Sequence, residues 1–193
     1  MIKLKLLVLM TVVAMAGCAH DISLSPRGDK MPGHNSSKVN KNVGYYISTA
    51  DLNKKFESPG GGGDSVSYMP YKDLDASLLS VLVTIYKDVF KLKAANDKAE
   101  LQKDKISYVF IPEIKTDSSS TSYLTWPPTD FTINLKLTAF DAAGKQVWQD
   151  TVTGKGHAEY DDFKSDFSLS ARLATEQALN KLKKAIESSS SLK

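Results

Sequence analysis

The sequence has one cysteine among its 193 residues, Cys18, so no disulfide can form within the chain. Histidine is scarce as well: there are three in all, and only His157 lies in the part of the chain that we expect to fold. A histidine-based metal site or a catalytic triad is therefore hard to assemble, and no serine lies in a Gly-x-Ser-x-Gly pattern. We expect a protein that is not an enzyme and that holds no metal or cofactor.

A strong excess of charge is also missing. The chain has 25 Lys and Arg against 22 Asp and Glu, which gives a formal net charge of +3. Lys3 and Lys5 belong to the expected leader, so the remaining chain is close to neutral. It carries no basic stripe of the kind that nucleic-acid-binding proteins use, and we expect no nucleic-acid partner. After residue 17 no apolar run is long enough to span a membrane.

The beginning of the chain does contain an apolar run, over residues 6–16, broken only by Thr11. It follows two lysines, and at about eleven residues it is shorter than the roughly twenty that cross a bilayer. Met15, Ala16, Gly17 and Cys18 come next. This order of charge, apolar run, small residues and cysteine resembles the lipobox of bacterial lipoproteins, although leucine is commoner than methionine at the first of these four positions.

The lipobox resemblance implies that residues 1–17 are removed as a signal peptide and that Cys18 carries covalent acyl chains. The alternative is an ordinary secretory signal followed by a chance cysteine, but a lone free thiol is a liability in an oxidising compartment. One acyl chain anchors marginally, at about 0.8 kcal/mol per buried CH₂, whereas several on one residue anchor permanently. Bacterial sorting rules favour the outer membrane over the inner one here, because Ala19 and not aspartate follows the cysteine. We therefore expect a lipid-anchored protein on the periplasmic face of the outer membrane.

The remaining chain divides into three parts by composition. Residues 18–42 are polar and contain two prolines and two glycines, which predicts a flexible tether behind the acylated cysteine. Residues 43–187 have the apolar patterning of a folded domain in the periplasm. Residues 188–193 are expected to form a disordered tail.

Apolar spacing predicts an α+β fold for the domain, with two helices packed on a small, mainly antiparallel sheet. The first helix is predicted from Asp73 as far as Leu92, and the second begins after Asp166 or Ser168 and ends near residue 187. Strands are expected at 43–48, 65–71, 106–111, 131–138 and 147–153. The run 106–111 is apolar on both faces, as in a central strand, and we expect pairing to stop at Pro112.

Glycines mark two further features of the predicted sheet. Residues 141–145 form a hairpin loop in which Gly144 is expected to adopt a positive φ. Gly154 and Gly156 predict a bulge or bend at the end of the return strand.

The order of elements resembles small lipoproteins of the bacterial envelope, loosely the YajG-like and LPP20-like families. The likeness lies in the lipobox, in the hairpin over 141–148 and in the Ala/Leu-rich helix over 169–187. It implies an accessory or structural protein of the envelope.

The candidate partner-binding residues are Tyr68, Tyr71 and Trp126, because aromatic side chains combine apolar area with a polar tip. The tyrosines could instead belong to the core, and Trp126, which two prolines follow, could simply stiffen a connection. The glycines at 60–63 could surround a phosphate, but no Gly-Lys-Ser/Thr ending follows and Asp64 would repel an anion, which favours a plain loop. We expect a non-enzymatic lipoprotein that binds an envelope protein; the alternative is a peptidoglycan- or lipid-binding module.

Overall fold

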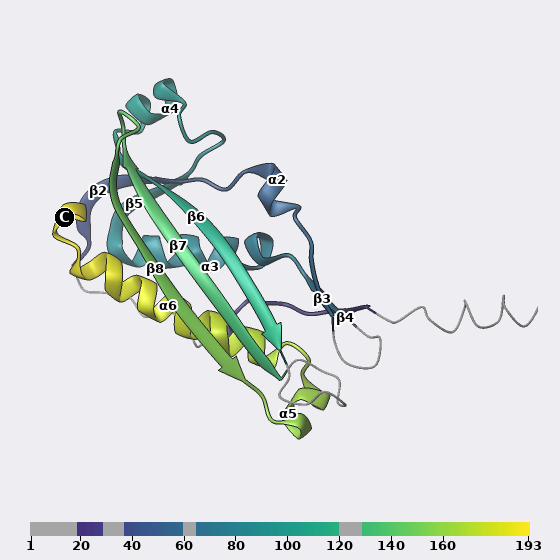
Figure 1. The fold of residues 1–193 in the computed structure, drawn as a ribbon. Helices are drawn as coiled ribbons and strands as arrows, with labels where there is room; N and C mark the ends of the chain where they lie inside the picture. Colours follow the sequence, from purple (N-terminus) through teal and green to yellow (C-terminus); the bar gives the residue numbers. More distant parts are fainter. Residues whose placement is uncertain (1–18, 29–36, 60–64, 120–128) are drawn as a thin grey trace, which may run out of the picture.

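The computed structural model describes residues 19–28, 37–59, 65–119 and 129–193. They form a five-stranded sheet, in the order β5-β2-β6-β7-β8, and a three-stranded sheet, in the order β1-β4-β3 (Figure 1). The elements are β1 (Ala19–Asp21), β2 (Val39–Tyr45), α2 (Thr49–Leu52), β3 (Phe56–Pro59), β4 (Ser65–Tyr68), α3 (Pro70–Ile85), β5 (Tyr86–Lys91), α4 (Lys98–Lys103), β6 (Ile106–Ser119), β7 (Asp130–Asp141), β8 (Gln146–His157), α5 (Tyr160–Ser165), α6 (Leu169–Ser188) and the short 3₁₀ helix η3 (Ser190–Leu192).

The predicted α+β class is confirmed. The long strands β6, β7 and β8 form an antiparallel meander, and the shorter β2 lies parallel to both β6 and β5, so the large sheet is mixed. The hairpin between β7 and β8 is also as predicted, with Gly144 at φ 83°. Asp141 fixes this turn, because its Oδ1 accepts hydrogen bonds from the backbone N–H groups of Ala143 and Lys145, both at 2.9 Å.

The two long helices α3 and α6 pack on one face of the large sheet. Alternate residues of β7 face them, and Ile133, Leu135 and Leu137 are at most 1 % exposed. These side chains, the apolar stripes of both helices and the inward side of β4 form one continuous core. The predicted arrangement of two helices over a sheet is therefore correct.

Helix α6 approaches β8 so closely that no side chain fits between them. A Cβ atom added to Gly154 would lie 1.9 Å from the backbone oxygen of Ala174, and one added to Gly156 would lie 2.0 Å from that of Ser170. The predicted bulge at these glycines is wrong, because β8 stays in register with β7 through both positions. Glycine is required at both positions because any side chain there would meet the backbone of α6.

The edge of β8 is closed by two side chains of α6. Lys181 Nζ donates to the backbone oxygen of Thr153 at 2.7 Å, and Gln177 Oε1 accepts from the backbone N–H of Lys155 at 3.0 Å. Unpaired backbone groups on an edge strand invite pairing with other chains. The helix therefore covers this part of the edge as well as the face of the sheet.

The first long helix is shorter than predicted. It ends at Ile85, and residues 86–91 leave the helix to form β5, which pairs with β2. Val89 and Phe90 have the β-branched and aromatic side chains that suit strands. Their spacing after Ile85 still fits a helical face, so periodicity alone did not separate the two elements.

Strand β6 continues through Pro112, where the prediction placed a break. Pro112 is in register with Leu137 of β7, and pairing extends to Ser119. Among the described strands, only β7 pairs with β6 beyond Phe110, because the ladder with β2 ends there. A proline is tolerated where a strand is hydrogen-bonded on one side only.

The predictions of a flexible tether over 18–42 and a disordered tail over 188–193 are both wrong in part. Residues 19–28 and 39–42, assigned to the tether, contribute β1, buried side chains and most of β2. The tail forms η3, and Leu192 is 1 % exposed within the main core. Residues 29–36 of the predicted tether lie outside the described residues.

Substitution of Gly156 by alanine should lower the free energy of unfolding by about 1–3 kcal/mol, because the new methyl group meets helix backbone and not a movable side chain. Urea denaturation followed by circular dichroism measures the change. Gly28→Ala is the matched control, since a Cβ there has nothing within 4 Å. Equal stability of the two variants would contradict the packing described for α6.

Candidate functional site

The segment that directly follows Cys18 is built into the domain. Strand β1 pairs in parallel with β4, and the backbone N–H of Ile22 donates to the oxygen of Ser67 at 2.9 Å. Ile22 lies in the core, and Leu24 is 0 % exposed. Two buried apolar side chains within ten residues explain why this polar sequence does not behave as a tether.

Helix α3 holds the same segment through its first turn. Asp73 Oδ2 accepts a hydrogen bond from the backbone N–H of Leu24 at 3.0 Å, and its backbone oxygen accepts one from Ser25 Oγ at 2.9 Å. Burial raises the pKa of the Asp73 carboxyl. The Asp73 carboxylate accepts the backbone hydrogen bond of Leu24 that a neighbouring strand would otherwise accept.

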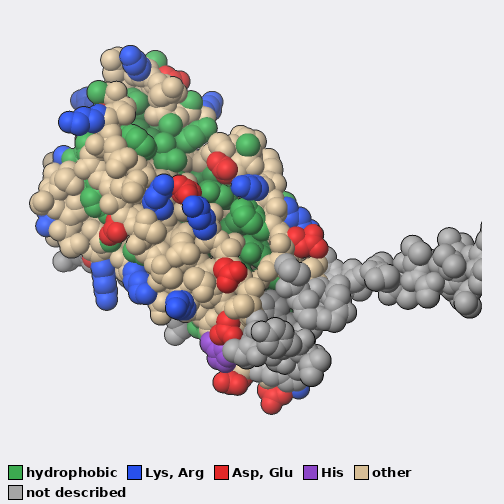
Figure 2. All heavy atoms as spheres, in the orientation of Figure 1, with side chains coloured by type: hydrophobic (Ala, Val, Ile, Leu, Met, Phe, Trp, Pro, Cys, Tyr) green, Lys and Arg blue, Asp and Glu red, His purple; other side chains and the backbone are tan. Residues whose placement is uncertain are grey.

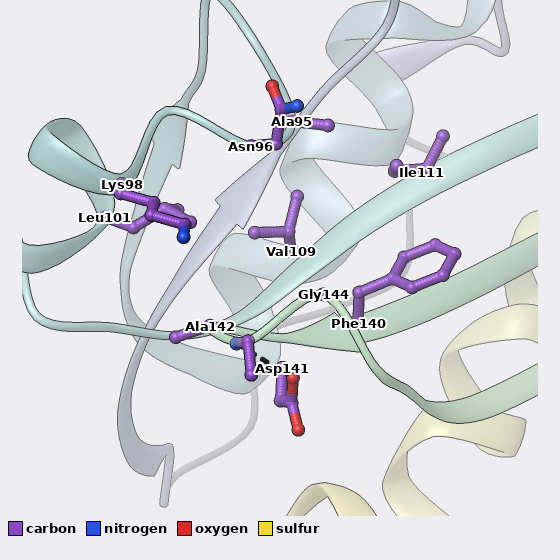
Figure 3. Close-up of a pocket in the computed structure, with 11 residues that line it drawn as sticks. Ala95, Asn96, Lys98, Leu101, Val109, Ile111, Phe140, Asp141, Ala142 and Gly144 are labelled. Carbon is purple, nitrogen blue, oxygen red and sulfur yellow. Dashed lines mark hydrogen bonds between the residues drawn. The ribbon is translucent and has the colours of Figure 1, made fainter.

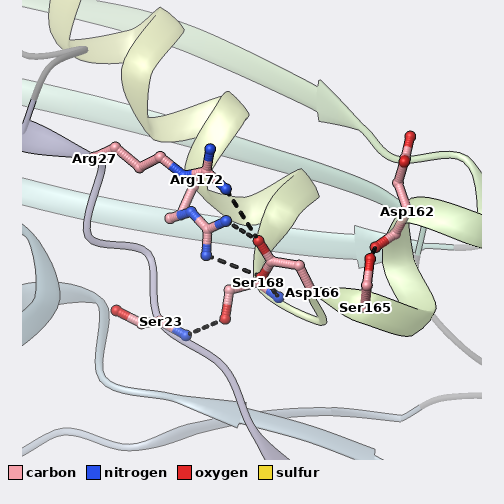
Figure 4. A network of polar contacts seen from close by, with 7 residues as sticks. All are labelled: Ser23, Arg27, Asp162, Ser165, Asp166, Ser168 and Arg172. Atoms are coloured by element: carbon pink, nitrogen blue, oxygen red, sulfur yellow. Dashed lines mark hydrogen bonds and ion pairs between the residues drawn. The ribbon is translucent and has the colours of Figure 1, made fainter.

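Helix α6 holds the segment from the other side (Figure 4). The backbone N–H of Ser23 donates to Ser168 Oγ at 3.0 Å, at the N-cap of the helix. Arg172 binds both carboxylate oxygens of Asp166, and Arg27 lies 3.7 Å from the same carboxylate. The hydrogen bond from Arg172 holds the pKa of Asp166 below its ordinary value, so this link persists at neutral pH.

These contacts fix where any group on Cys18 would leave the domain. Cys18 itself lies outside the described residues, but one peptide bond joins it to Ala19, and consecutive Cα atoms are about 3.8 Å apart. The ring of His20 lies 5.3 Å from that of Phe167, which precedes α6. The exit point is therefore next to Ala19, at the end of the molecule that holds β3, β4 and α5 (Figure 1).

The predicted aromatic surface is not formed. Tyr68 is 5 % exposed and its hydroxyl bonds to Thr116 Oγ1 at 2.9 Å; Tyr71 is 7 % exposed and accepts from the backbone N–H of Ile114 at 3.1 Å. Both tyrosines are core residues that use their polar tips to hold β6, so their assignment to a partner-binding patch is wrong. Trp126 and the glycines at 60–63 lie outside the described residues.

No long helix among the described residues covers the opposite face of the large sheet. Polar side chains cover its middle, where Glu113 pairs with Lys136 and, at 3.3 Å, with Lys115. Toward the β7–β8 hairpin the same face becomes apolar, and α4 covers a second, smaller core of Leu92, Leu101, Ile106 and Val109. Gly44 lets Leu92 lie on the sheet, because a Cβ there would be 2.5 Å from Leu92 Cδ1.

A groove remains between α4 and the hairpin, and we call it the α4 groove. Its first hollow, of about 210 Å³, is drawn in Figure 3; its lining residues are Ala95, Asn96, Lys98, Leu101, Val109, Ile111 and 140–144. A second hollow, of about 590 Å³, shares Lys98, Leu101 and two hairpin alanines with the first and adds Gln102, Lys105 and Ile106. Figure 2 shows hydrophobic side chains gathered at this end of the face and charged ones over its middle.

Sequence reasoning missed the α4 groove, although one signal was available. In β7 the core residues occupy odd positions from Phe131 to Leu137, whereas Phe140 falls on the even, outward side. A large aromatic residue out of phase with its strand indicates a second apolar surface. Val109 and Ile111 continue that surface on β6, as the prediction of a strand covered on both faces anticipated.

Catalytic groups do not gather in the described parts of the chain. Within those parts, no three His, Cys, Asp or Glu side chains are placed to hold a metal ion. His157 Nδ1 lies 2.7 Å from Asp130, whose hydrogen bond raises the pKa of the exposed imidazole, and Nε2 lies 3.4 Å from Glu159. Both described partners of this histidine are carboxylates. Nor does any described helix have the length and apolarity needed to cross a membrane.

Comparisons with known proteins find structural similarity at low sequence identity. No family model and no curated protein matches the sequence. Solved structures that it resembles include protein XCC0632 from Xanthomonas campestris, of the family DUF330, with a TM-score of 0.46 and 14 % identity over 87 % of this chain and 90 % of that one. A PelC dodecamer from Paraburkholderia phytofirmans gives a TM-score of 0.40 and 16 % identity over 76 % and 95 % of the two chains. A minor lipoprotein from Acinetobacter baumannii gives 0.37 and 16 % over 77 % and 91 %. Nothing about the activity of this chain follows from likenesses of this size.

Truncation of Leu24 to alanine should lower the free energy of unfolding by about 2–5 kcal/mol, since a fully buried leucine leaves a cavity. The same change at Leu173, which is 37 % exposed, is the matched control and should have a much smaller effect. Thermal and urea denaturation give both values. If Leu24→Ala were as stable as the control, the segment after Cys18 would be a tether and not part of the domain.

Proposed function

We propose that this chain is a bacterial envelope lipoprotein that is cleaved before Cys18, acylated there and held on the periplasmic face of the outer membrane. The observation that carries the proposal is the docked segment 19–28. The residues after a lipobox lead straight into the domain, so acyl chains on Cys18 hold one defined end of the fold at the bilayer. The sequence of Met15, Ala16, Gly17 and Cys18 supports the acylation itself.

The docked segment gives the anchored domain a preferred orientation. Strands β3 and β4 meet the end of β6, where Ser58 and Ser118 are hydrogen-bonded, and the exit point of Cys18 lies at this same end. The β7–β8 hairpin lies at the other end of the twelve-residue strand β7. At about 3.3 Å per residue the two ends are roughly 35 Å apart. The end with the hairpin and α4 therefore points away from the membrane, toward the periplasm.

We further propose that the domain acts by binding an envelope protein and not by catalysis. Of the groups that sequence reasoning weighed for chemistry, the glycines at 60–63 lie outside the described residues, and His157 is held by Asp130 and Glu159. What the fold offers instead is a face covered by two helices and an open face with an apolar hollow at the hairpin end. Rigid scaffolds that present one concave apolar patch are suited to recognition.

Replacement of Cys18 by alanine should remove the protein from the outer-membrane fraction, because no acyl chain can then be attached. It should appear as an uncleaved precursor or in the periplasm, as immunoblots of separated membranes would show. Ala19→Asp, with Ala19→Asn as its uncharged control, should move the acylated protein to the inner membrane. A Cys18→Ala protein that still fractionates with the outer membrane would refute the proposed anchor.

A further inference from the structure

We infer that the α4 groove is the docking site for a protein partner, and that it receives a segment carrying a large apolar side chain next to acidic residues. This inference rests on the proposed function, in which the domain binds an envelope protein, and it names the surface and the chemistry of recognition. The groove combines an apolar floor, a basic rim and a position far from the anchor.

The floor of the groove is apolar and is held in place by the small core beneath it. Val109 and Leu101 are buried, while Ile111 and Phe140 are half-buried and contribute their exposed parts to the first hollow. The hairpin closes one side with the small residues Ala142, Ala143 and Gly144, which leave the hollow open to an incoming side chain. An apolar side chain that enters the hollow leaves water and covers these apolar surfaces, and this burial is favourable.

The rim of the groove is basic. Lys98 lines both hollows and Lys105 lines the second, and neither makes an ion pair with any residue that the structure describes. The one carboxylate in the lining, Asp141, is turned into the hairpin, where its Oδ1 accepts two backbone hydrogen bonds. In Figure 3 Lys98 extends from α4 toward the strand residues. Two cations without described partners beside an apolar floor complement an acidic, apolar segment.

The size of the first hollow favours a side chain over a whole small ligand. Pockets that enclose drug-sized ligands measure about 300–1,000 Å³ and bury most of the ligand. At about 210 Å³ the hollow instead suits one large apolar anchor of the type that dominates protein interfaces. The second hollow is larger, at about 590 Å³, but fewer residues line it and it is more open, so it does not enclose a ligand and leaves room for the flanking residues of the same segment.

The position of the groove favours a protein over a membrane lipid as its occupant. It lies at the hairpin end of the sheet, roughly 35 Å from the end that joins Cys18, by the rise of about 3.3 Å per residue of β7. Lipids of the membrane that holds the anchor do not reach so far. A protein that extends through the periplasm does.

The test is a selection of random peptides on phage against the purified, acylated full chain, with empty detergent micelles as the background. The enriched peptides should share a large apolar residue within about one helical turn of Asp or Glu. Fluorescence anisotropy then measures their affinity for variants of the chain. Lys98→Glu should weaken binding about tenfold or more, and Lys98→Arg should retain it, because the rim interaction is electrostatic.

Lys155→Glu provides the matched control. Lys155 is an exposed lysine at the anchored end of the same sheet face, with its backbone and not its side chain bonded to α6. This variant should bind the peptides as wild type does. Circular dichroism of all three variants checks that they fold alike.

Four results would overturn the inference: no peptides enriched above background, enriched peptides without acidic residues, equal binding by Lys98→Glu, or equal weakening by Lys155→Glu. Native mass spectrometry of the full chain can give two further results that would overturn the inference. A non-covalent acyl ligand or a dimer that Lys98→Glu abolishes would assign the groove to a lipid or to a second copy. None of these outcomes bears on the anchor, which the Cys18→Ala fractionation tests separately.

Discussion

The contact of α6 with the glycines of β8 fixes most of the other features of this molecule. Because Gly154 and Gly156 have no side chains, the helix backbone lies directly on the strand, and α6 has one possible depth over the sheet. That depth places Ser168 and Arg172 at the N-terminal end of α6, where they meet residues 23–27 and Asp166. It also puts Lys181 and Gln177 within reach of the β8 edge. If α6 lay farther from the sheet, it would lose its contacts with the β8 edge and with the docked N-terminal segment together.

The two faces of the large sheet have different roles as a result. Both long helices are used on one face, so the other can be apolar only where a smaller element covers it, and α4 does this at one end. The cover is incomplete, which leaves the α4 groove next to the hairpin. The docked segment after Cys18 is tied to the opposite end through β4, Asp73 and Asp166. The segment that leads to Cys18 and the α4 groove thus lie at the two ends of one rigid sheet.

Local signals in the sequence predicted the parts of the fold that local chemistry determines. The alternation from Phe131 to Leu137, the positive φ of Gly144 and the start of α6 after Ser168 all follow from neighbouring residues, and all are confirmed. The start of β5 depends instead on pairing with β2, a contact between distant segments that outweighs helical spacing. Pro112 is likewise tolerated only because β6 has lost one neighbour.

The candidate site was harder to predict, for the same reason. Leu24 and Ile22 are isolated apolar residues in a polar stretch, and only the tertiary structure supplies the cavity that buries them. Tyr68 and Tyr71 have the composition of an interface, but β6 offers hydroxyl and backbone partners in the core. The groove joins residues from α4, β6 and the hairpin, which no motif links. The phase of Phe140 in β7 and the apolar run over 106–111 were the sequence signals for its floor.

The central claim is that the domain rests on the membrane by its α5 end, with the α4 groove facing away. Energy transfer from single dye labels to acceptor lipids in vesicles tests it most directly. Cys18 is the single cysteine of the sequence and is blocked in the proposed acylated protein, so an introduced cysteine is the one thiol to label. Ser165→Cys and Ala143→Cys place a dye at the two ends, both on exposed residues. We expect strong transfer from position 165 and weak transfer from position 143, because the two positions lie roughly 35 Å apart along the sheet. Equal transfer from both positions would contradict it.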